Sequence, residues 1–337
     1  MVIARAPASM LPGMPSNDPF LPYVFTREDA RLAGLTKHQL DQRVRTGAWK
    51  TLARGAYCLP VTWDEATLHE RQILAVTAAL KIVSYPAWAS HASAAALYDL
   101  PIPSRGPAWI TRLPPASTRY SEMLTVEVAT VPLRDQWTMR GLSTLSLPRT
   151  VADGMRHFSS PDGLALGDAA IRRQPQIYED LLRVLEYSSD WPYAARALQL
   201  LPLIDGSRES PLESWSYWYM RKHRVPLPEC QVDLYDEYGT FLGRTDFWWE
   251  LFGVAGEADG LTKYDVPRDG TVQDAQQALI DEKQREDLFR RAGAGVIRWG
   301  ARDLGRPRTW AASLERDLRA HGPNSFRGRA VVHQRFA

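Results

Sequence analysis

The chain has 337 residues, of which 45% are hydrophobic and 24% charged, with a formal net charge of +2. This length suits two or three folding units, and the composition is that of a globular protein, not a disordered one. No apolar run is long enough to span a bilayer, and proline and glycine interrupt the N-terminal stretch where a signal peptide would need apolar residues. We therefore expect no membrane partner and a cytoplasmic location.

Two cysteines, Cys58 and Cys230, lie far apart in the sequence and lack the spacing of a metal site. We expect both to be reduced core residues and neither to be a nucleophile. The first 22 residues are expected to form a flexible N-terminus, and the chain as a whole is predicted to be a multidomain α/β protein.

Residues 23–62 predict two short helices followed by a hairpin. Thr26 and Thr36 stand where helix N-caps are expected, and Gly47 closes the second helix. Two short strands then flank a turn with Arg54 at its tip. Helix, turn, helix and basic hairpin follow one another as in a winged helix-turn-helix, in which the second helix enters the major groove and the wing touches phosphate.

This pattern resembles the N-terminal domain of AbiEi-type antitoxins and related actinobacterial regulators. The resemblance implies double-stranded DNA as a partner and leaves room for a toxin or another protein partner. An alternative interpretation is a protein-protein adaptor, with Trp49 and Tyr57 forming a small core. The candidate DNA contacts are polar or basic residues of the second helix and the wing, namely Thr36, Lys37, Gln39, Gln42, Arg43 and Arg54.

Residues 63–204 predict a mixed α+β connector domain. An apolar stripe favours a long helix near its start, and alternation around Val126 favours a strand. His91 begins a further helix and is interpreted as a capping or packing residue. The segment SLPRTVADG resembles the connector of the same actinobacterial family. Since no metal, phosphate or catalytic-triad spacing stands out, we expect a scaffold.

Residues 205–321 predict the order helix, three strands, helix, strand, helix, and residues 322–337 a basic tail. This order resembles the restriction-endonuclease-like α/β/α domain of the PD-(D/E)XK nucleases. The segments ESPLES, GRTDFWW, GEADGLTKY, EKQRED and VIRWGARDL are similar, in order, to a family of unknown function related to very-short-patch repair endonucleases.

The resemblance implies a site for Mg, or Mn, held by Asp246 and Glu257, in which Glu213 either completes the ligand shell or orients a water. A carboxylate pair on strands suits such an ion, which neutralises phosphate charge and activates water. The sequence departs from the nuclease pattern at Asp259, which stands where a lysine is usual. Lys263 lies four residues farther on and is the candidate to replace that lysine.

Two functions follow from this site. One is a metal-dependent DNA endonuclease targeted by the winged helix. The alternative is a catalytically silent DNA-binding transcriptional regulator or antitoxin of a type IV toxin-antitoxin-like system. A purely structural interpretation also exists, in which Asp246 forms an ion pair with Arg244 and Asp259 belongs to a turn.

Overall fold

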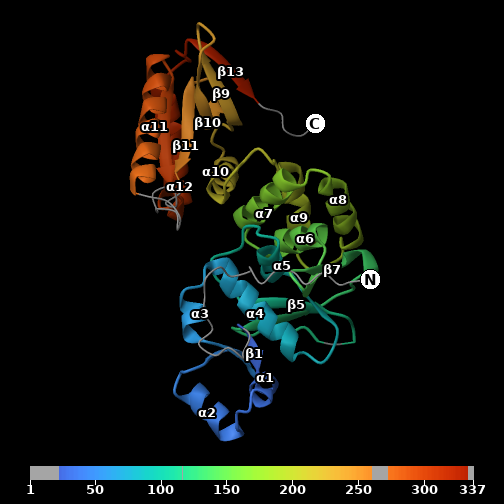
Figure 1. Cartoon of the computed structure of the whole chain (residues 1–337). Helices are drawn as coiled ribbons and strands as arrows, with labels where there is room; N and C mark the ends of the chain where they lie inside the picture. The colour runs from blue at the N-terminus through green and yellow to red at the C-terminus, as the bar shows by residue number, and fades with distance from the viewer. Residues whose placement is uncertain (1–22, 116, 260–271, 333–337) are drawn as a thin grey trace, which may run out of the picture. The chain divides into compact units, whose positions relative to one another are not determined.

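The computed structural model describes residues 23–115, 117–259 and 272–332, and of residues 272–281 only the helical backbone. The chain divides into two compact units (Figure 1). One contains the residues up to Phe158 together with Ile177–Ala197. The other contains Ser159–Gln176 and the residues from Leu198 onward. The sequence placed a domain boundary at residue 205, whereas the second unit also takes up a helix from before it.

The first unit consists of short strands and helices in two sheets. Its elements are β1 (Phe25–Thr26), α1 (Arg27–Leu32), α2 (Lys37–Arg45), β2 (Lys50–Ala53), β3 (Ala56–Cys58), α3 (Pro60–Asp64), α4 (Leu68–Ile82), β4 (Ala87–Ala89), α5 (His91–Leu97), β5 (Ala108–Arg112), β6 (Leu124–Val128), β7 (Gln136–Met139), β8 (Leu142–Leu145), α6 (Leu147–His157) and α8 (Ile177–Tyr187). Helix α9 (Ala194–Leu200) begins in this unit and ends in the other.

The N-terminal elements form two capped helices beside a small sheet of order β1-β3-β2. Thr26 and Thr36 are N-caps, and each forms a capping box with the residue three positions later. Trp49 and Tyr57 are buried with Phe25 between the helices and the sheet. The predicted helix-turn-helix and hairpin are therefore present in this order.

The middle of the first unit is built on a five-stranded sheet of order β6-β5-β4-β8-β7. Helices α4 and α5 pack against it through alanines and larger aliphatic residues such as Val76 and Leu97. Small side chains allow helices to approach closely, which suits the alanine-rich α5. This region confirms the expected mixture of helices and strands.

The second unit is built on a five-stranded sheet of order β12-β11-β10-β9-β13. Its elements are α7 (Ser160–Arg173), α10 (Pro211–Lys222), β9 (Glu229–Asp236), β10 (Phe241–Trp249), β11 (Val254–Asp259), α11 (Val272–Arg291), β12 (Gly295–Gly300), α12 (Pro307–His321) and β13 (Gly328–Val332). Strands β11 and β12 are parallel, and the other pairs are antiparallel. The observed order from α10 to α12 is the one that the sequence predicted.

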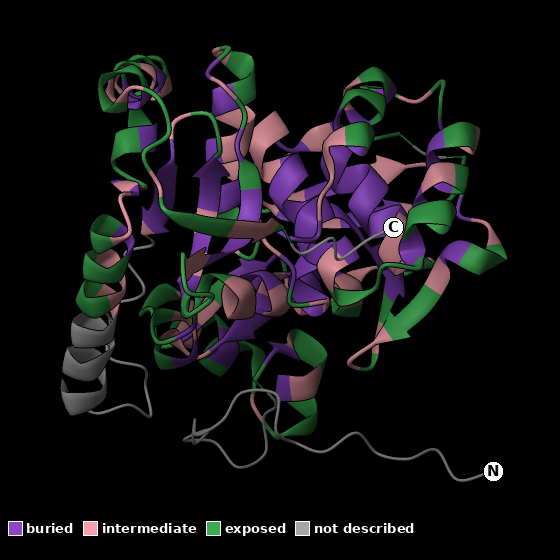
Figure 2. Cartoon of the chain, turned by 90° about the horizontal axis from the view of Figure 1, so that it is seen from above, coloured by how far each residue is buried: buried purple, intermediate pink, exposed green. Residues whose placement is uncertain are grey.

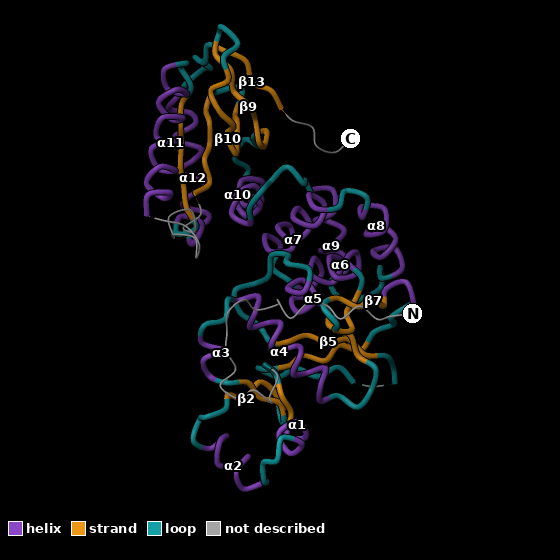
Figure 3. The backbone as a smooth tube through the Cα atoms, in the orientation of Figure 1, coloured by secondary structure: helices purple, strands orange, loops and turns teal. Residues whose placement is uncertain are grey.

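Helices cover both faces of this sheet (Figure 3). Alternate residues of a strand point to opposite faces. Accordingly, Phe247 and Trp249 of β10 join a core with α10 and α12, whereas Trp248 packs with Phe289 of α11 on the other face. Buried residues gather on the strands and exposed residues on the outer sides of the helices (Figure 2). The second unit is thus a three-layer α/β/α arrangement.

The prediction of a loose basic tail at residues 322–337 is wrong for one segment. Gly328–Val332 form β13, which pairs antiparallel with β9 over Val232–Asp236. An edge strand offers unpaired N–H and C=O groups to any extended segment. The two valines that end β13 favour such a conformation, which the basic composition of the segment obscured.

Within the second unit, a buried ion pair joins α7 to the segment that precedes α10. Arg208 and Asp168 are each about 1% exposed, and Nε and Nη2 of Arg208 donate to the two Asp168 oxygens at 2.7 and 2.9 Å. Ser214 of α10 also donates to Asp168 at 2.7 Å. These contacts explain why α7 belongs with the elements that follow residue 198.

Asp168→Ala is expected to lower the free energy of unfolding by about 3–5 kcal/mol, because it leaves the Arg208 charge buried without its partner. Urea denaturation monitored by tryptophan fluorescence measures this change. Glu315→Ala, which removes an exposed pair with Arg319, is the control and should cost at most about 1 kcal/mol. Equal costs for the two variants would contradict the assignment.

Candidate functional site

The N-terminal helix pair presents polar and basic side chains to solvent. Thr36, Lys37, Gln39 and Gln42 are exposed on or next to α2, and Arg54 is exposed in the turn between β2 and β3. Gly55 takes a φ of +94°, which lets the two strands of the hairpin turn tightly at this point. The structure therefore places the predicted contacts on a helix surface and on a hairpin tip.

Three of these predicted contacts also have local structural roles. Gln39 accepts from the Thr36 backbone N–H at 2.8 Å, and Thr36 accepts from the Gln39 backbone N–H at 3.3 Å. Arg43 is only half-exposed, and its guanidinium lies 5.6 Å from the centre of the Trp49 ring. Within the part of the chain that the structure describes, the side chains of Lys37, Gln42 and Arg54 have no such role.

The predicted acids of the second unit lie on one face of its sheet. Asp246 shares the face of Trp248 on β10, and Glu257 and Asp259 share the face of Ala255 on β11, which α11 covers. The Ala258 backbone N–H donates to Asp246 at 2.8 Å, which ties the two strands together at this point. Asp246, Glu257 and Asp259 therefore form one group on this face of the sheet, which we call the acid cluster.

Glu213 reaches the same cluster from the first turn of α10. Gln231 of β9 links it to Asp246, donating to Glu213 at 2.9 Å and to Asp246 at 3.2 Å. Glu213 also accepts from the Glu209 backbone N–H at 2.8 Å, so it helps to fix the start of its helix. Sequence reasoning missed Gln231, because an isolated glutamine on a strand carries no signal.

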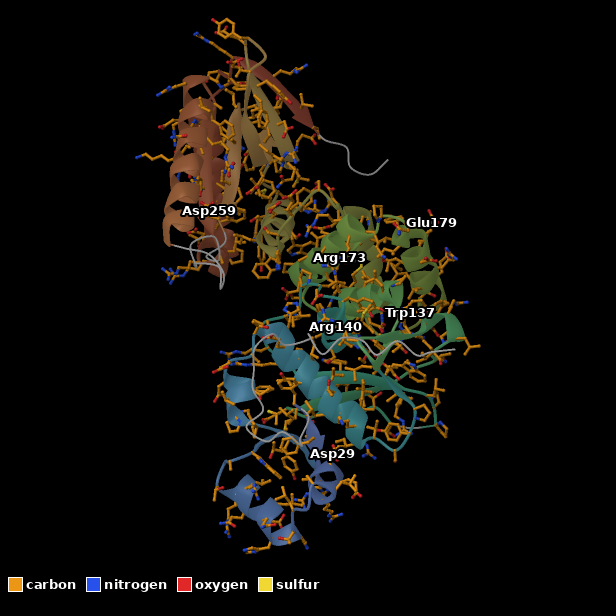
Figure 4. All side chains as sticks on the ribbon, viewed as in Figure 1. Asp29, Trp137, Arg140, Arg173, Glu179 and Asp259 are labelled. Atoms are coloured by element: carbon orange, nitrogen blue, oxygen red, sulfur yellow. The ribbon has the colours of Figure 1, made fainter. Side chains whose placement is uncertain are left out.

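Two arginines occupy the other side of the cluster. Arg285 of α11 donates to Glu257 at 3.0 Å, and Arg298 of β12 donates to both Asp259 oxygens at 2.7 and 2.8 Å. Arg298 also pairs with Glu282 and Glu286 of α11. Asp259, labelled in Figure 4 beside α11, is the last residue of β11, and the residues after it, where a turn would follow, lie outside the described residues. The sequence analysis assigned no partner to either arginine.

Burial makes two of the carboxyl groups hard to ionise. Burial, and then the nearby Asp246 charge, raise the pKa of Glu213 to about 7 and that of Glu257 to about 7, although Arg285 lowers the latter. Glu257 Oε1 is buried and has no hydrogen-bond partner in the structure as described. The cluster can therefore hold protons near neutral pH, and one of its oxygens remains available to a cation.

Other sequence predictions have mixed outcomes. Lys263 lies outside the described residues. Arg244 pairs with Asp233 on β9 at 2.6 Å, so the proposed partnership with Asp246 is not how this arginine is held. Cys58 and Cys230 are free and buried, and burial raises the pKa of both thiols, which keeps them protonated.

Comparison with known families and proteins adds two findings. Residues 19–60 match the family model described as "Transcriptional regulator, AbiEi antitoxin". The chain is also 26% identical over 249 residues to two curated proteins of Mycobacterium tuberculosis, covering 74% of this chain and 87% of theirs. They are the uncharacterized protein Rv2248 of strain H37Rv and the uncharacterized protein MT2308 of strain CDC 1551.

The family match confirms the predicted resemblance of the N-terminal region to AbiEi antitoxins. It extends from before Phe25 to the end of the β2–β3 hairpin, and so covers the helix-turn-helix but not the acid cluster. Among the helices that the structure describes, none is long and apolar enough to cross a membrane.

Glu213→Gln is expected to raise the free energy of unfolding by about 1–2 kcal/mol at pH 8 and to change it little at pH 4. Because the folded-state pKa lies above the ordinary 4.5, the stability contributed by Glu213 is full below pH 4.5 and is lost as the pH rises through 7. A glutamine carbonyl can still accept from Glu209 and Gln231. Urea unfolding at the two pH values measures the difference.

The control is Glu315→Gln on the exposed face of α12, which should show no such dependence on pH. A gain for Glu213→Gln that is as large at pH 4 as at pH 8 would contradict this assignment.

Proposed function

We propose that the protein is a DNA-binding transcriptional regulator of the antitoxin type, with the N-terminal winged helix as its DNA-binding domain. The match of residues 19–60 to the AbiEi antitoxin model carries this proposal. The exposed side chains of α2 and of the hairpin tip give it a physical basis, since short polar and basic side chains suit base edges and phosphates.

The charges around the winged helix suit a nucleic-acid partner. Lys37, Arg45 and Arg54 are exposed, and of the nearby acids Asp41 is engaged by Arg27 at 3.4 Å. Exposed cations that are not neutralised by acids attract a phosphate backbone even when the net charge is small. Double-stranded DNA is the proposed partner, and a cognate toxin is a second, protein partner of the same regulator.

The arginine contacts of the acid cluster favour a regulatory role for the second unit as well. Arg298 holds Asp259, which replaces the usual lysine, and Arg285 supplies a positive charge to Glu257. A carboxylate that already accepts from an arginine gains less from a metal ion. In this proposal the second unit docks on nucleic acid or on a partner without cutting DNA.

Lys37→Ala and Arg54→Ala are each expected to weaken binding to DNA from upstream of the protein's own gene and to reduce the salt dependence by about one counterion per lost phosphate contact. Fluorescence anisotropy over a range of KCl concentrations measures both quantities. Arg316→Ala, an exposed cation on α12, is the matched control. An equal loss of DNA affinity in all three variants would contradict the proposal that the winged helix is the DNA-binding domain.

A metal-dependent DNA endonuclease is the second candidate function, favoured by the partnerless buried oxygen of Glu257. Hard carboxylate oxygens suit Mg or Mn, and Asp246 and Glu257 would hold the ion. When bound, it would neutralise phosphate charge and activate water. A site with three carboxylate ligands would need one oxygen from each acid within 4.8 Å of the other two. The described residues contain no such group of three acids, which favours the regulator.

The double substitution Asp246→Asn with Glu257→Gln separates the two functions. On the regulator proposal, operator binding is unchanged and neither the wild type nor the variant cuts supercoiled plasmid in Mg or Mn. Cleavage by the wild type that is lost in the variant would establish the endonuclease instead. Cleavage that persists in the variant comes from a contaminant and leaves the regulator proposal standing.

A further inference from the structure

The connector, which sequence reasoning treated as scaffold, contains a cluster of metal-ligand side chains. His91 begins α5, Glu127 lies on β6 and His157 ends α6. One nitrogen or oxygen from each lies within 4.8 Å of the other two, and no other group of three such residues in the described part of the chain does so. The three residues are widely separated in sequence, so only the fold brings them together.

The distances within this cluster are those of a coordination shell. His91 Nε2 lies 3.0 Å from His157 Nδ1 and 3.2 Å from Glu127 Oε2. Ligands at 2.0–2.1 Å in a tetrahedron around zinc are about 3.3 Å apart. Small adjustments of the side chains would therefore suffice to place an ion between the three atoms.

The surroundings of His91 prepare its Nε2 atom to act as a ligand. Ser90 Oγ lies 3.1 Å from His91 Nδ1, so a proton on Nδ1 can be donated to the serine while Nε2 keeps its lone pair. His91 is fully buried, and its backbone φ of +49° is unusual for a residue other than glycine. Such a conformation costs about 1–3 kcal/mol and often marks a functional position.

Glu127 contributes an oxygen that the protein leaves without a hydrogen bond. Its Oε2 atom is buried and lacks a partner in hydrogen-bond geometry, although His91 Nε2 is close. Arg156 approaches the other oxygen, Oε1, at 3.6 Å. A buried, unpaired carboxylate oxygen costs free energy unless a positive charge or a hydrogen-bond donor lies against it. A cation bound at Oε2 would supply that positive charge.

Nearby charges do not exclude a cation. Arg149, Arg156 and Arg196 lie around the cluster, but Asp153 pairs with the first two and Arg196 donates to the backbone carbonyls of Arg156 and Phe158. With Asp135 beside Arg149 and Glu127 itself, three acids balance three arginines.

The cluster also has a route to solvent. His157 is half-buried, and the ring of the exposed Tyr193 lies 5.5 Å from it. Trp109 covers His91 on the other side, with ring centres 4.2 Å apart. The cluster therefore comes nearest to solvent at His157, and the rings of Trp109 and Tyr193 border it.

We propose that His91, Glu127 and His157 form a binding site for a divalent transition metal ion of the zinc class, with water as the fourth ligand. Two imidazoles and one carboxylate are ligands that zinc accepts in three-residue sites. The site is distinct from the acid cluster of the second unit, which offers oxygen ligands alone. It does not depend on DNA binding.

The test uses the full-length protein, stripped with EDTA and then titrated with ZnCl₂ by calorimetry and with CoCl₂ by visible absorption. The expected result is one equivalent per chain, with the absorption of four-coordinate cobalt. Glu127→Gln and His157→Gln should each weaken zinc binding by more than about 10-fold. Ser90→Ala, which removes the hydrogen bond that orients His91, should weaken it by about 10–100-fold.

Two controls make the result specific. His38→Gln removes an exposed histidine of α2 and should leave zinc binding unchanged, as should Asp246→Asn in the second unit. Circular dichroism confirms that each variant is folded, and the half-exposed His157 is a safer position to change than the buried His91. No zinc binding by the wild type, or binding that survives both Glu127→Gln and His157→Gln, would overturn the proposal.

Discussion

Every charge buried in this protein needs a partner of opposite sign, because an unpaired ion in a core costs several kcal/mol. In the first unit, Asp153 of α6 accepts from Arg149 at 2.9 Å and from Arg156 at 2.6 Å, and all three are fully buried. Trp191 lies 4.3 Å from the Arg149 guanidinium and 5.0 Å from that of Arg156. These contacts hold α6 to the segment that follows α8.

The second unit meets the same requirement with the pair of Asp168 and Arg208, which holds α7 to the segment before α10. In its acid cluster, Glu257 and Asp259 have Arg285 and Arg298 as partners. Glu213 and Asp246 accept instead from the neutral amide of Gln231. The arginines reach the acids from α11 and β12, so the helix that covers this face of the sheet also neutralises it. A catalytic metal and this set of arginines are alternative solutions to one electrostatic problem, and the arginine contacts favour the regulator.

Local signals made much of the fold predictable. Thr26 and Thr36 announce their helices, because a threonine followed three residues later by an acid or amide forms a capping box. The run of consecutive large apolar residues Phe247, Trp248 and Trp249 in β10 follows from burial on both faces of the sheet. The strand β13 was missed because an edge strand depends on the neighbour that it pairs with, and a basic tail gives no sign of that neighbour.

The sequence by itself determined the order of elements, the resemblance of the first helices to AbiEi antitoxins and the acids that share a strand face, since caps, period and spacing are local properties. Only the tertiary structure decided the partners. Whether Glu257 meets an arginine, and whether His91 meets Glu127 and His157, depends on contacts between elements up to 66 residues apart. Such contacts produce no characteristic spacing of residues in the sequence, because loops of any length can join the elements that supply them.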